Sequence, residues 1–434
     1  MKASPESTTA ARERVVLVGV GLGGSPAEID ESLAELASLS DTAGAIVVGS
    51  FRQNLAHPHA ATFIGPGKAQ EIASFCAENE VDTVLFDDNL TAAQQKNLER
   101  AIERKVIDRR ALILDIFAMR ALTNEGKLQV ELAQLEYMLP RLTRLWRHLS
   151  RQAGGIGTRG PGETQLETDR RRIDQRLQNL RERLEKFRHH RERQRERRRG
   201  IPVPTVSLVG YTNAGKSTML NALTGAETYA DDKLFATLDP LLRRAVLPGG
   251  MRVIFSDTVG FVRKLPHELV AAFRATLEEI READLLLHCI DGADPAAEHK
   301  MRAVYTVLSE IDAGDKPVIE VYNKLDQVAG ARFGRWPALA GEPVRCGASA
   351  ITGAGLPDLL AAVEQELGRF VEEVVLSIPY GDQDAIRRIR SEATVLAEHH
   401  EQGRFVVRLR LARSRLGPLL QYRVRDDALV PVGD

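Results

Sequence analysis

The sequence contains little cysteine, few aromatic residues and no long apolar run. Its three cysteines, Cys76, Cys289 and Cys346, form no Cys-x-x-Cys pair. A sparse, odd set excludes a disulfide scaffold and fits a reducing compartment, where each thiol is a small buried apolar side chain. No apolar run reaches the roughly 20 residues that a membrane helix needs. The first 14 residues lack the apolar core of a signal peptide. These absences predict a cytoplasmic protein without a membrane span.

The charges balance over the whole chain but are unevenly distributed along it. The 434 residues carry a net charge of −1, with 43% hydrophobic and 27% charged residues. This is an ordinary globular composition, with room for about two to four domains. Residues 141–200 contain 19 Lys and Arg against 8 Asp and Glu, so the rest of the chain is acidic. A basic segment on an otherwise acidic protein suggests a polyanionic partner.

Short apolar runs alternate with helical stretches between residues 14 and 125. The predicted strands are 15–20, 45–48 and 83–86, and the predicted helices are 27–39, 68–79 and 91–104. This alternation predicts an N-terminal α/β domain with a mostly parallel sheet, preceded by a disordered tail at residues 1–13. The glycines after the first run lack the GxGxxG spacing, and Gly65 to Lys68 are interpreted as a helix start, so neither segment predicts a phosphate site.

An antiparallel helical hairpin is predicted for residues 126–200. Leucines recur at helical spacing from Leu128 to Leu149, glycines interrupt residues 153–162, and apolar residues from Ile173 to Phe187 follow a heptad spacing. The arginines then lie on outer faces. They either form a solvated surface with i,i+4 partners or, as we favour because acids are scarce, contact RNA or another polyanion. No aromatic residues are interleaved with them, which disfavours stacking on single-stranded bases.

The strongest motif is a phosphate-binding loop. Residues Gly210 to Ser217 read GYTNAGKS, which matches GxxxxGK[ST] between an apolar run at 206–209 and a helix expected from Thr218. The glycines let the backbone curl so that successive N–H groups face phosphates, and the helix N-terminus adds positive potential. Lys216 is expected to reach the terminal phosphates, and Ser217 to bind Mg²⁺.

A segment that binds metal and senses the γ-phosphate is predicted after the strand at 252–255. Asp257 at the end of that strand can hold Mg²⁺ through water, and the Gly260 N–H can contact the γ-phosphate. Thr237 is the expected switch threonine that closes over the metal ion, with Thr228 as its competitor.

A guanine-binding segment is predicted at Asn323 to Asp326, after the strand at 318–321. The Asp326 carboxylate can accept from both N1–H and the C2 amine of guanine, which adenine lacks; taken alone, Asp326 could instead cap a helix. Backbone N–H groups at 349–351 can support the base. The spacings from the P-loop lysine match a Ras-like GTPase, with 41 residues to Asp257, 107 to Asn323 and 133 to Ser349.

Two residues bear on hydrolysis. Phe261 stands where Ras has the glutamine that orients the attacking water. Hydrolysis by the isolated protein is therefore expected to be slow, with the missing group supplied elsewhere. Asn213 could bind a monovalent cation such as K⁺ that acts like an arginine finger, or it could occupy a left-handed turn. The sequence leaves both interpretations open.

The predicted GTP site thus combines five segments of a G domain at residues 201–370. Lys216, Thr237 and Gly260 are the catalytic candidates, and Ser217, Thr237 and Asp257 are the Mg²⁺ ligands. The full set is Gly210, Tyr211, Thr212, Asn213, Ala214, Gly215, Lys216, Ser217, Thr218, Phe235, Ala236, Thr237, Leu238, Asp239, Asp257, Thr258, Val259, Gly260, Asn323, Lys324, Leu325, Asp326, Ser349, Ala350 and Ile351.

A small α+β domain is predicted for residues 371–434. Strand-like runs at 374–378 and 405–411 flank a predicted helix at 384–399, and a further strand is expected near Tyr422. This segment carries no chemical motif.

Residues 14–370 resemble the HflX-type GTPases, in the Obg–HflX group of translation-factor-like P-loop GTPases. The most specific segment is RGPGETQLETDRR at 159–171. Other matching segments are Val106–Arg109, Leu112–Phe117, Lys127–Glu136, Gly210–Thr218, Leu234–Pro240 and Asp257–Phe261. Leu241 departs from the family, which often has threonine there.

The resemblance implies the four-domain order given above and a GTPase that binds the large (50S) ribosomal subunit and its rRNA with GTP bound. It also implies dissociation of stalled or stressed ribosomes, with the loop at 154–162 pointing toward the peptidyl-transferase region. Two other functions stay open on the sequence. One is an ATP-using RNA chaperone or helicase-like protein, although no second P-loop is present, and the other is a nucleotide-dependent switch that recruits a protein effector. We expect a monomer.

Overall fold

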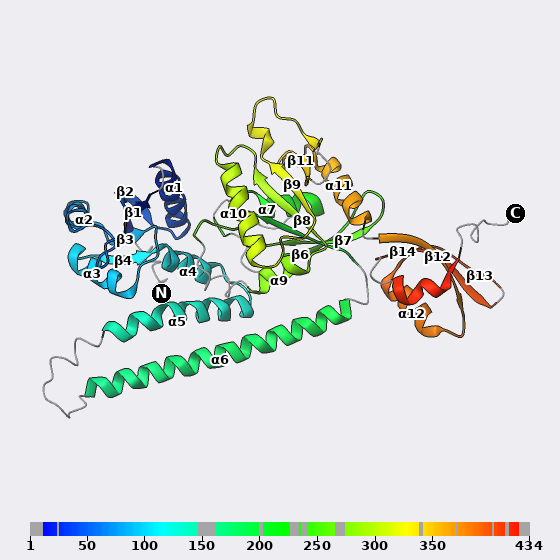
Figure 1. Cartoon of the computed structure of the whole chain (residues 1–434), viewed down its shortest axis with the longest axis horizontal. Coiled ribbons are helices and arrows are strands. Elements are labelled where there is room, and N and C mark those ends of the chain that lie inside the picture. The colour runs from blue at the N-terminus through cyan, green and yellow to red at the C-terminus, as the bar shows by residue number, and fades with distance from the viewer. Residues whose placement is uncertain are drawn as a thin grey trace, which may run out of the picture. The chain divides into compact units, whose positions relative to one another are not determined.

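The computed structural model is divided into two compact units. It describes residues 12–23, 26–145, 161–198, 203–225, 234–235, 241–264, 274–337, 342–369, 371–401, 403–412 and 416–424. The first unit comprises Met1–Leu184, Asp231–Asp239 and Val262–Arg274; the second comprises Glu185–Ala230, Pro240–Phe261 and Ala275–Asp434. Figure 1 labels their elements along the chain. Within the described residues, no helix combines the length and apolarity needed to cross a membrane.

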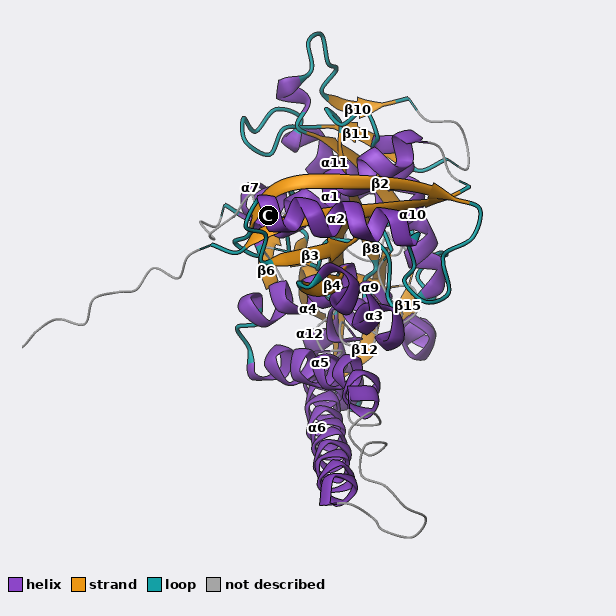
Figure 2. Ribbon diagram, turned by 90° about the vertical axis from the view of Figure 1, so that its left-hand side faces the viewer, coloured by secondary structure: helices purple, strands orange, loops and turns teal. Residues whose placement is uncertain are grey.

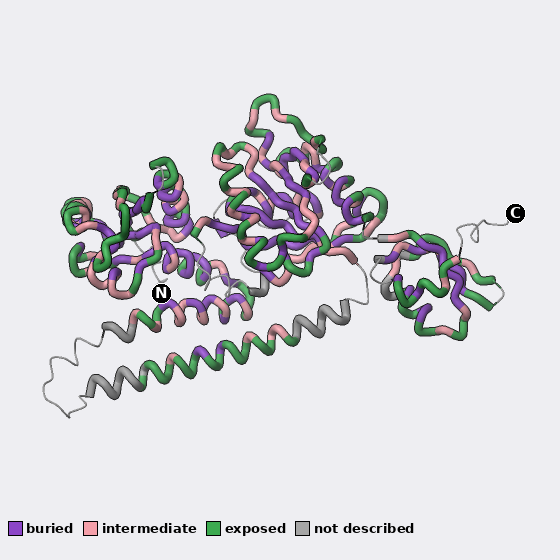
Figure 3. Tube along the Cα trace, viewed as in Figure 1, coloured by how far each residue is buried: buried purple, intermediate pink, exposed green. Residues whose placement is uncertain are grey.

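The first unit begins with a four-stranded parallel sheet in the order β2-β1-β3-β4. Strands and helices alternate along the chain, which confirms the predicted parallel α/β pattern. The elements are β1 (Arg14–Leu22), α1 (Pro26–Thr42), β2 (Ile46–Leu55), α2 (Pro66–Glu78), β3 (Thr83–Phe86), α3 (Ala92–Ile102), β4 (Lys105–Asp108) and α4 (Arg109–Arg120). The central strands β1 and β3 are buried (Figure 3).

Strand β2 is much longer than the strand that the apolar run at residues 45–48 predicted. It pairs with β1 as far as Leu55 and is visible as a long arrow in Figure 2. It lies at an edge of the sheet, where its polar residues are partly exposed, so an apolar run could not reveal its full length. Helix α2 begins at Pro66 after Gly65, which confirms the predicted helix start.

The hairpin consists of α5 (Asn124–Leu145) and α6 (Pro161–Arg198). Leu177 and Leu180 of the predicted seam are buried. The glycine-rich loop was predicted to extend to residue 162, but α6 already begins at Pro161, a residue suited to the first turn of a helix. The remainder of that loop lies outside the described residues.

The second unit contains a seven-stranded sheet in the order β10-β11-β9-β8-β5-β7-β6. Its strands are parallel except for the two edge strands, β10 and β6. The elements are β5 (Thr205–Gly210), α7 (Lys216–Thr224), β6 (Leu241–Val246), β7 (Arg252–Asp257), α9 (Arg274–Glu282), β8 (Leu285–Asp291), α10 (Ala297–Glu310), β9 (Val318–Asn323), η1 (Leu325–Gln327), β10 (Gly334–Trp336), β11 (Val344–Gly347) and α11 (Leu356–Gly368). Helix α7 begins two residues earlier than predicted.

The last segment is a four-stranded antiparallel sheet in the order β13-β14-β12-β15 with one α-helix. Its elements are β12 (Val371–Pro379), α12 (Gln383–Glu392), β13 (Thr394–Glu401), β14 (Arg404–Ala412), η2 (Gly417–Tyr422) and β15 (Arg423–Val424). The helix predicted at 384–399 is wrong in its second half, because β13 occupies residues after 393 and pairs with β14. Tertiary strand pairing overrides the local helical preference there.

Candidate nucleotide-binding site

The P-loop joins β5 to α7 and needs glycine at both of its ends. Gly210 and Gly215 have φ values of +152° and +83°. A methyl group at Gly210 would lie 2.3 Å from the Cys289 carbonyl oxygen, and one at Gly215 would lie 2.4 Å from Asn323 Nδ2. Asn213 has φ of +61°, so it does occupy a left-handed position, while its possible role in cation binding stays a prediction.

The lysine of the loop, Lys216, is buried, and the neighbouring Ser217 contacts the end of β7. Lys216 Nζ donates to the carbonyl oxygens of Gly210 and Tyr211, at 3.2 and 2.8 Å. Burial lowers the pKa of this ammonium, although the charge of Asp257 opposes that shift. Ser217 Oγ donates to Asp257 Oδ2 at 2.6 Å. A hydroxyl and a carboxylate oxygen are hard ligands of the kind that Mg²⁺ prefers, so these two predicted ligands fit the metal.

The segment after Asp257 continues along the P-loop. Phe261 N donates to the Gly210 oxygen at 3.1 Å, and Thr212 N donates to the Phe261 oxygen at 2.8 Å. Gly260 therefore lies directly beside the P-loop lysine. A methyl group at Gly260 would lie 3.0 Å from Lys216 Nζ and 2.8 Å from Thr212 Cα. Thr258 has a structural role, since its hydroxyl donates to the Leu208 oxygen at 2.6 Å.

Asn323 connects the P-loop to the loop after β11. Its Nδ2 donates to the Ala214 oxygen, and its Oδ1 accepts from Ala350 N, both at 3.0 Å. The next residue, Lys324, donates from Nζ to Asp291 Oδ2 at 2.7 Å. Asp291 was not predicted as a site residue; it ends β8, and only the sheet order brings it beside Lys324.

Asp326 is exposed, and its role in reading the base stays a prediction. It is the second residue of η1, whose N-cap is Lys324, so the structure does not support a helix-capping role for it. Ser349 is buried, whereas Ile351 is 74% exposed. The Ala350 N–H is already used by Asn323, which is a contact that the sequence did not indicate.

The segment predicted to carry the switch threonine is described only in part. Thr237, its neighbours Ala236, Leu238 and Asp239, and the competitor Thr228 lie outside the described residues. Phe235 is described and belongs to the first unit. It is 3% exposed and packs edge-on against Phe117, with ring centroids 4.7 Å apart.

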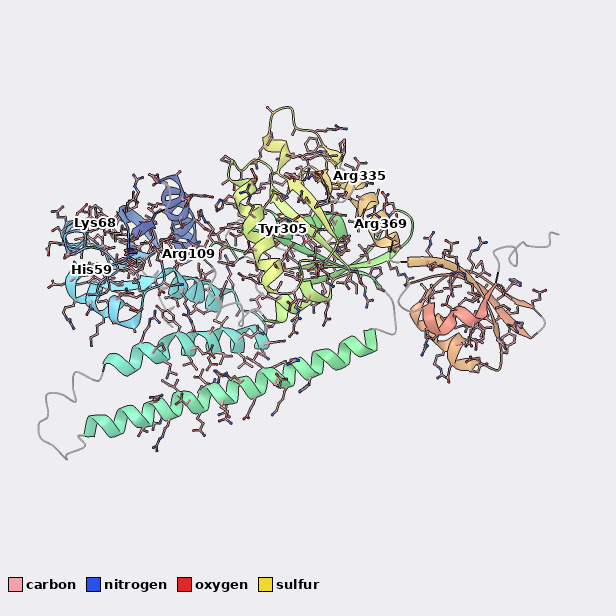
Figure 4. The ribbon with its side chains drawn as sticks, viewed as in Figure 1. His59, Lys68, Arg109, Tyr305, Arg335 and Arg369 are labelled. Carbon is pink, nitrogen blue, oxygen red and sulfur yellow. The ribbon has the colours of Figure 1, made fainter. Side chains whose placement is uncertain are left out.

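A cavity of about 70 Å³ lies beside the P-loop and was not predicted. It is lined by Tyr211 to Ala214, the end of β8 and one side of α10. His288 on its wall is 1% exposed, and burial, with a smaller effect from the charge of Lys216, lowers its pKa to about 3. Its ring packs edge-on against Tyr305, which Figure 4 labels. A single histidine in an apolar run gives no signal of this environment.

The first unit has a larger cavity, of about 420 Å³, near the carboxyl ends of β3 and β4. Its lining includes Asp108 and Arg141. These two residues bind each other, with Arg141 donating to Asp108 Oδ2 at 3.1 Å and to the Leu90 oxygen at 3.0 Å. The charges of Asp108 and Arg141 therefore neutralise each other.

A parallel sheet that carries GxxxxGKS, an aspartate at the end of the neighbouring strand and an Asn-Lys-x-Asp turn defines a P-loop GTPase. Three family models match the chain. Their descriptions are GTP-binding GTPase N-terminal (residues 30–118), GTP-binding GTPase Middle Region (120–198) and 50S ribosome-binding GTPase (205–324).

Close relatives extend over most of the chain. GTPase HflX of Caldanaerobacter subterraneus subsp. tengcongensis is 48% identical, over 90% of this chain and 89% of the relative. GTPase HflX of Escherichia coli (strain K12) is 50% identical, over 80% and 82%. The chain belongs to the HflX family of GTPases, and it binds and hydrolyses GTP. Among solved structures, a GTP-binding protein from Sulfolobus solfataricus in complex with GDP is 23% identical over 82% of this chain and 99% of that one; its TM-score of 0.43 is too low to support an argument.

Proposed function

We propose that this GTPase binds the large ribosomal subunit in its GTP-bound state and dissociates stalled or stressed ribosomes in the cytoplasm. The family model over residues 205–324 is described as a 50S ribosome-binding GTPase, which supports the choice of partner. The observation that carries the proposal is the arginine-rich surface of α6.

Helix α6 carries more basic than acidic residues, although several of its arginines, among them Arg170, lie within ion-pair distance of an acid. Arg176 and Arg181 each pair at 2.7 Å with a glutamate of α5, Glu131 and Glu136 respectively. These two arginines therefore link α6 to α5. Arg170, Arg171, Arg172 and Arg183 are exposed along the same helix. A long helix with a positive outer surface suits the phosphates of rRNA.

Sedimentation tests the proposal directly. Ribosomes are centrifuged through sucrose gradients with the protein and either a non-hydrolysable GTP analogue or GDP. We expect the protein to migrate with 50S subunits, and 70S particles to decrease, only with the analogue. Equal migration with both nucleotides would contradict nucleotide control, and no migration with either would remove the ribosome as a partner.

A variant set separates rRNA contact from hairpin stability. Changing Arg170, Arg171, Arg172 and Arg183 to glutamine is expected to weaken 50S binding and to flatten its salt dependence by about 0.9 per lost phosphate contact. The matched control changes two exposed arginines of the other unit, Arg302 and Arg387, to glutamine. An unchanged salt slope in the α6 variant would assign these arginines to a solvated surface.

The site roles are part of the same proposal. Lys216 and the Gly260 N–H contact the γ-phosphate, Thr237 completes the Mg²⁺ site formed with Ser217 and Asp257, and Asp326 selects guanine. When bound, Mg²⁺ would neutralise phosphate charge. Because Phe261 cannot orient water, we expect turnover to be slow alone and faster on 50S subunits. Replacing K⁺ with Na⁺ tests Asn213: an unchanged rate, with and without ribosomes, would exclude a K⁺ role.

A further inference from the structure

Asp291, the last residue of β8, binds the lysine that follows the neighbouring strand β9 (Figure 1). The two strands are parallel, and Asp291 pairs in register with Asn323 at the end of β9. The next residue, Lys324, donates from Nζ to Asp291 Oδ2 at 2.7 Å. The side chains of Asp291 and Lys324 are 23% and 19% exposed, so most of this ion pair is shielded from solvent. All three residues belong to the second unit, and Lys324 lies two residues before Asp326.

The carboxylate of Asp291 is fixed by contacts besides the lysine. Its Oδ1 accepts from Ala293 N at 3.1 Å, and the intervening Gly292 donates its N–H to the Asn323 oxygen at 2.8 Å. A methyl group at Gly292 would lie 2.6 Å from Leu325 Cδ2 and 3.0 Å from the Asn323 oxygen, so only glycine allows this close an approach. The loop after β8 is therefore packed directly on the loop after β9, and Asp291 is a fixed acceptor.

The backbone of Lys324 adopts a conformation that is uncommon for lysine. Its φ value is +60°, in the left-handed region that residues with a side chain rarely occupy. Such conformations persist where surrounding contacts hold them, and they cluster at binding sites. Two contacts do so here, because the side chain of Asn323 donates to the Ala214 oxygen and the Lys324 ammonium donates to Asp291. The direction of the Lys324 side chain is thus set both at its backbone and at its ammonium group.

A second carboxylate on the same loop has a different partner. Asp294 pairs with Lys300 of α10, and its Oδ1 accepts from Ala296 N at 2.9 Å. Burial would raise the pKa of Asp294, but the hydrogen bonds from Lys300 and Ala296 outweigh it and lower that pKa. Asp294 is therefore ionised and engaged by Lys300, whereas Asp291 is the acid that accepts a hydrogen bond from the Lys324 ammonium.

A lysine side chain that is already ordered can contribute to binding at little entropic cost. A free lysine loses rotamer freedom when a ligand orders it, and that loss reduces the affinity for the ligand. The ion pair with Asp291 orders the four-carbon stem of Lys324 before a nucleotide binds. The stem is apolar and belongs to the proposed guanine-binding segment, so it can cover one side of the base while its charge remains paired.

We propose that Asp291 is a positioning residue for guanine nucleotides, which holds Lys324 so that the lysine stem forms one wall of the base site. The proposal rests on the proposed placement of guanine at Asn323 to Asp326. Base and ribose are the same in GDP and GTP, so both nucleotides gain equally from the ordered lysine. An interaction of equal strength in the ground state and the transition state changes KM but not kcat. Asp291 therefore acts on nucleotide affinity rather than on hydrolysis.

The test measures, for the full-length protein, GTP turnover and the affinities for fluorescent GDP and a fluorescent non-hydrolysable GTP analogue. Asp291→Asn removes the charge but keeps an Oδ1 atom that can accept from Ala293 N. We expect both nucleotides to bind about two- to tenfold more weakly, the range for ordering one long side chain, with kcat unchanged. Lys324→Met removes the ammonium and should weaken both nucleotides to a similar extent. The double variant should match either single variant, because both changes remove one interaction.

Asp312→Asn is the matched control. It removes the exposed ion pair with Arg281 in the same unit by the same substitution, and it should leave both affinities unchanged. Additive losses in the double variant, a loss confined to one nucleotide, or a fall in kcat would overturn the role of Asp291. Unchanged affinities in Asp291→Asn alone would also overturn it. Unchanged affinities in both Asp291→Asn and Asp326→Asn would instead show that guanine does not bind at this segment.

Discussion

The two parallel sheets of this protein carry charged residues at the same place, the carboxyl ends of their strands, but use them differently. In the first unit, Asp87 and Asp108 are bound by arginines of their own chain, Arg109 and Arg141. In the second unit, Lys216 donates to the backbone oxygens of Gly210 and Tyr211, and Asp326 is exposed.

The difference lies in the loops rather than in the sheets. The loop after β5 has glycines at both ends, so backbone N–H groups can converge on a ligand. The residues after β3 and β4 are aspartates that cap helices or accept from cations. The same architecture thus gives a nucleotide site in one sheet and an internally neutralised edge in the other. Four predictions test this contrast, from the largest expected effect to the smallest.

The first change is Asp326→Asn at the nucleotide edge. An amide nitrogen would then face the guanine amine, and we expect GTP affinity to fall roughly 10⁴-fold, because a buried polar group is left unpaired. Xanthosine triphosphate has a carbonyl at that position and should bind better than GTP. Titration with both nucleotides measures this, with Asp315→Asn, another exposed aspartate of the domain, as control. A variant that still prefers GTP would show that Asp326 does not read the base.

The second change is Arg109→Met at the neutralised edge. It leaves the carboxylates of Asp87 and Glu35 buried without their cation, at a cost of about 3–5 kcal/mol in the free energy of unfolding of the first unit. Calorimetry should show the transition of that unit at a lower temperature. Arg52→Met removes an exposed pair with Asp30 and should cost less than about 1 kcal/mol. Equal losses of stability in the two variants would mean that the buried ion pairs of Arg109 do not stabilise this edge of the sheet.

The third change is His288→Phe beside the P-loop. The pKa of His288 is about 3, below that of an unfolded histidine, so between these values the unfolded chain binds a proton that the folded chain does not. The free energy of unfolding of the second unit should therefore fall as pH drops below about 6.5, by up to about 1.4 kcal/mol per pH unit. The variant should lose this slope, so its stability relative to wild type should rise at pH 5.

Urea unfolding at pH 7 and pH 5 measures this difference. His57→Phe, at an exposed histidine of the first unit, is the control for replacing a histidine by phenylalanine outside the second unit. A variant with the full wild-type slope would mean that His288 is protonated in the folded protein.

The smallest expected effect compares one helical tyrosine from each unit, Tyr137 of α5 and Tyr305 of α10. Tyr137 donates to Asp108 Oδ1 at 3.0 Å, and Tyr305 donates to Glu320 Oε1 at 2.8 Å. Each carboxylate keeps other partners, so Tyr137→Phe and Tyr305→Phe should each cost about 1 kcal/mol. Thermal unfolding of both variants measures whether the two losses of stability are equal. A loss several times larger in only one unit would show that its polar network is more cooperative than that of the other.

Local patterns predicted those parts of the fold that depend on neighbours along the chain. The runs at 83–86 and 252–255 are β3 and the start of β7, and the P-loop lies between a strand and a helix as its motif requires. The sequence pattern gave a wrong prediction where a strand forms only because it pairs with another strand. Strand β13 was predicted as part of a helix because its residues suit one, and only pairing with β14 makes it extended.

In the candidate site, too, residues within motifs were predicted and contacts between distant residues were not. Lys216, Ser217 and Asp257 were predicted from motif and spacing, and the structure brings them together. Asp291 was missed because its partner, Lys324, is 33 residues away and no motif includes it. The pairing of Lys264 with Asp87 and Asp88 was missed for the same reason, although the basic pair Arg263 and Lys264 was visible in the sequence.

The sequence by itself determined the residue types of the nucleotide site: glycines where the backbone must curl, a lysine and a serine at the start of the following helix, and aspartates at the ends of strands. These properties belong to residue types and short spacings, so they can be read without a fold. Only the tertiary structure decided which distant charges meet, such as Lys264 with Asp87, 177 residues apart. Their pairing depends on strand order and burial, because an ion pair forms between groups that the whole fold brings within a few ångströms and partly removes from water.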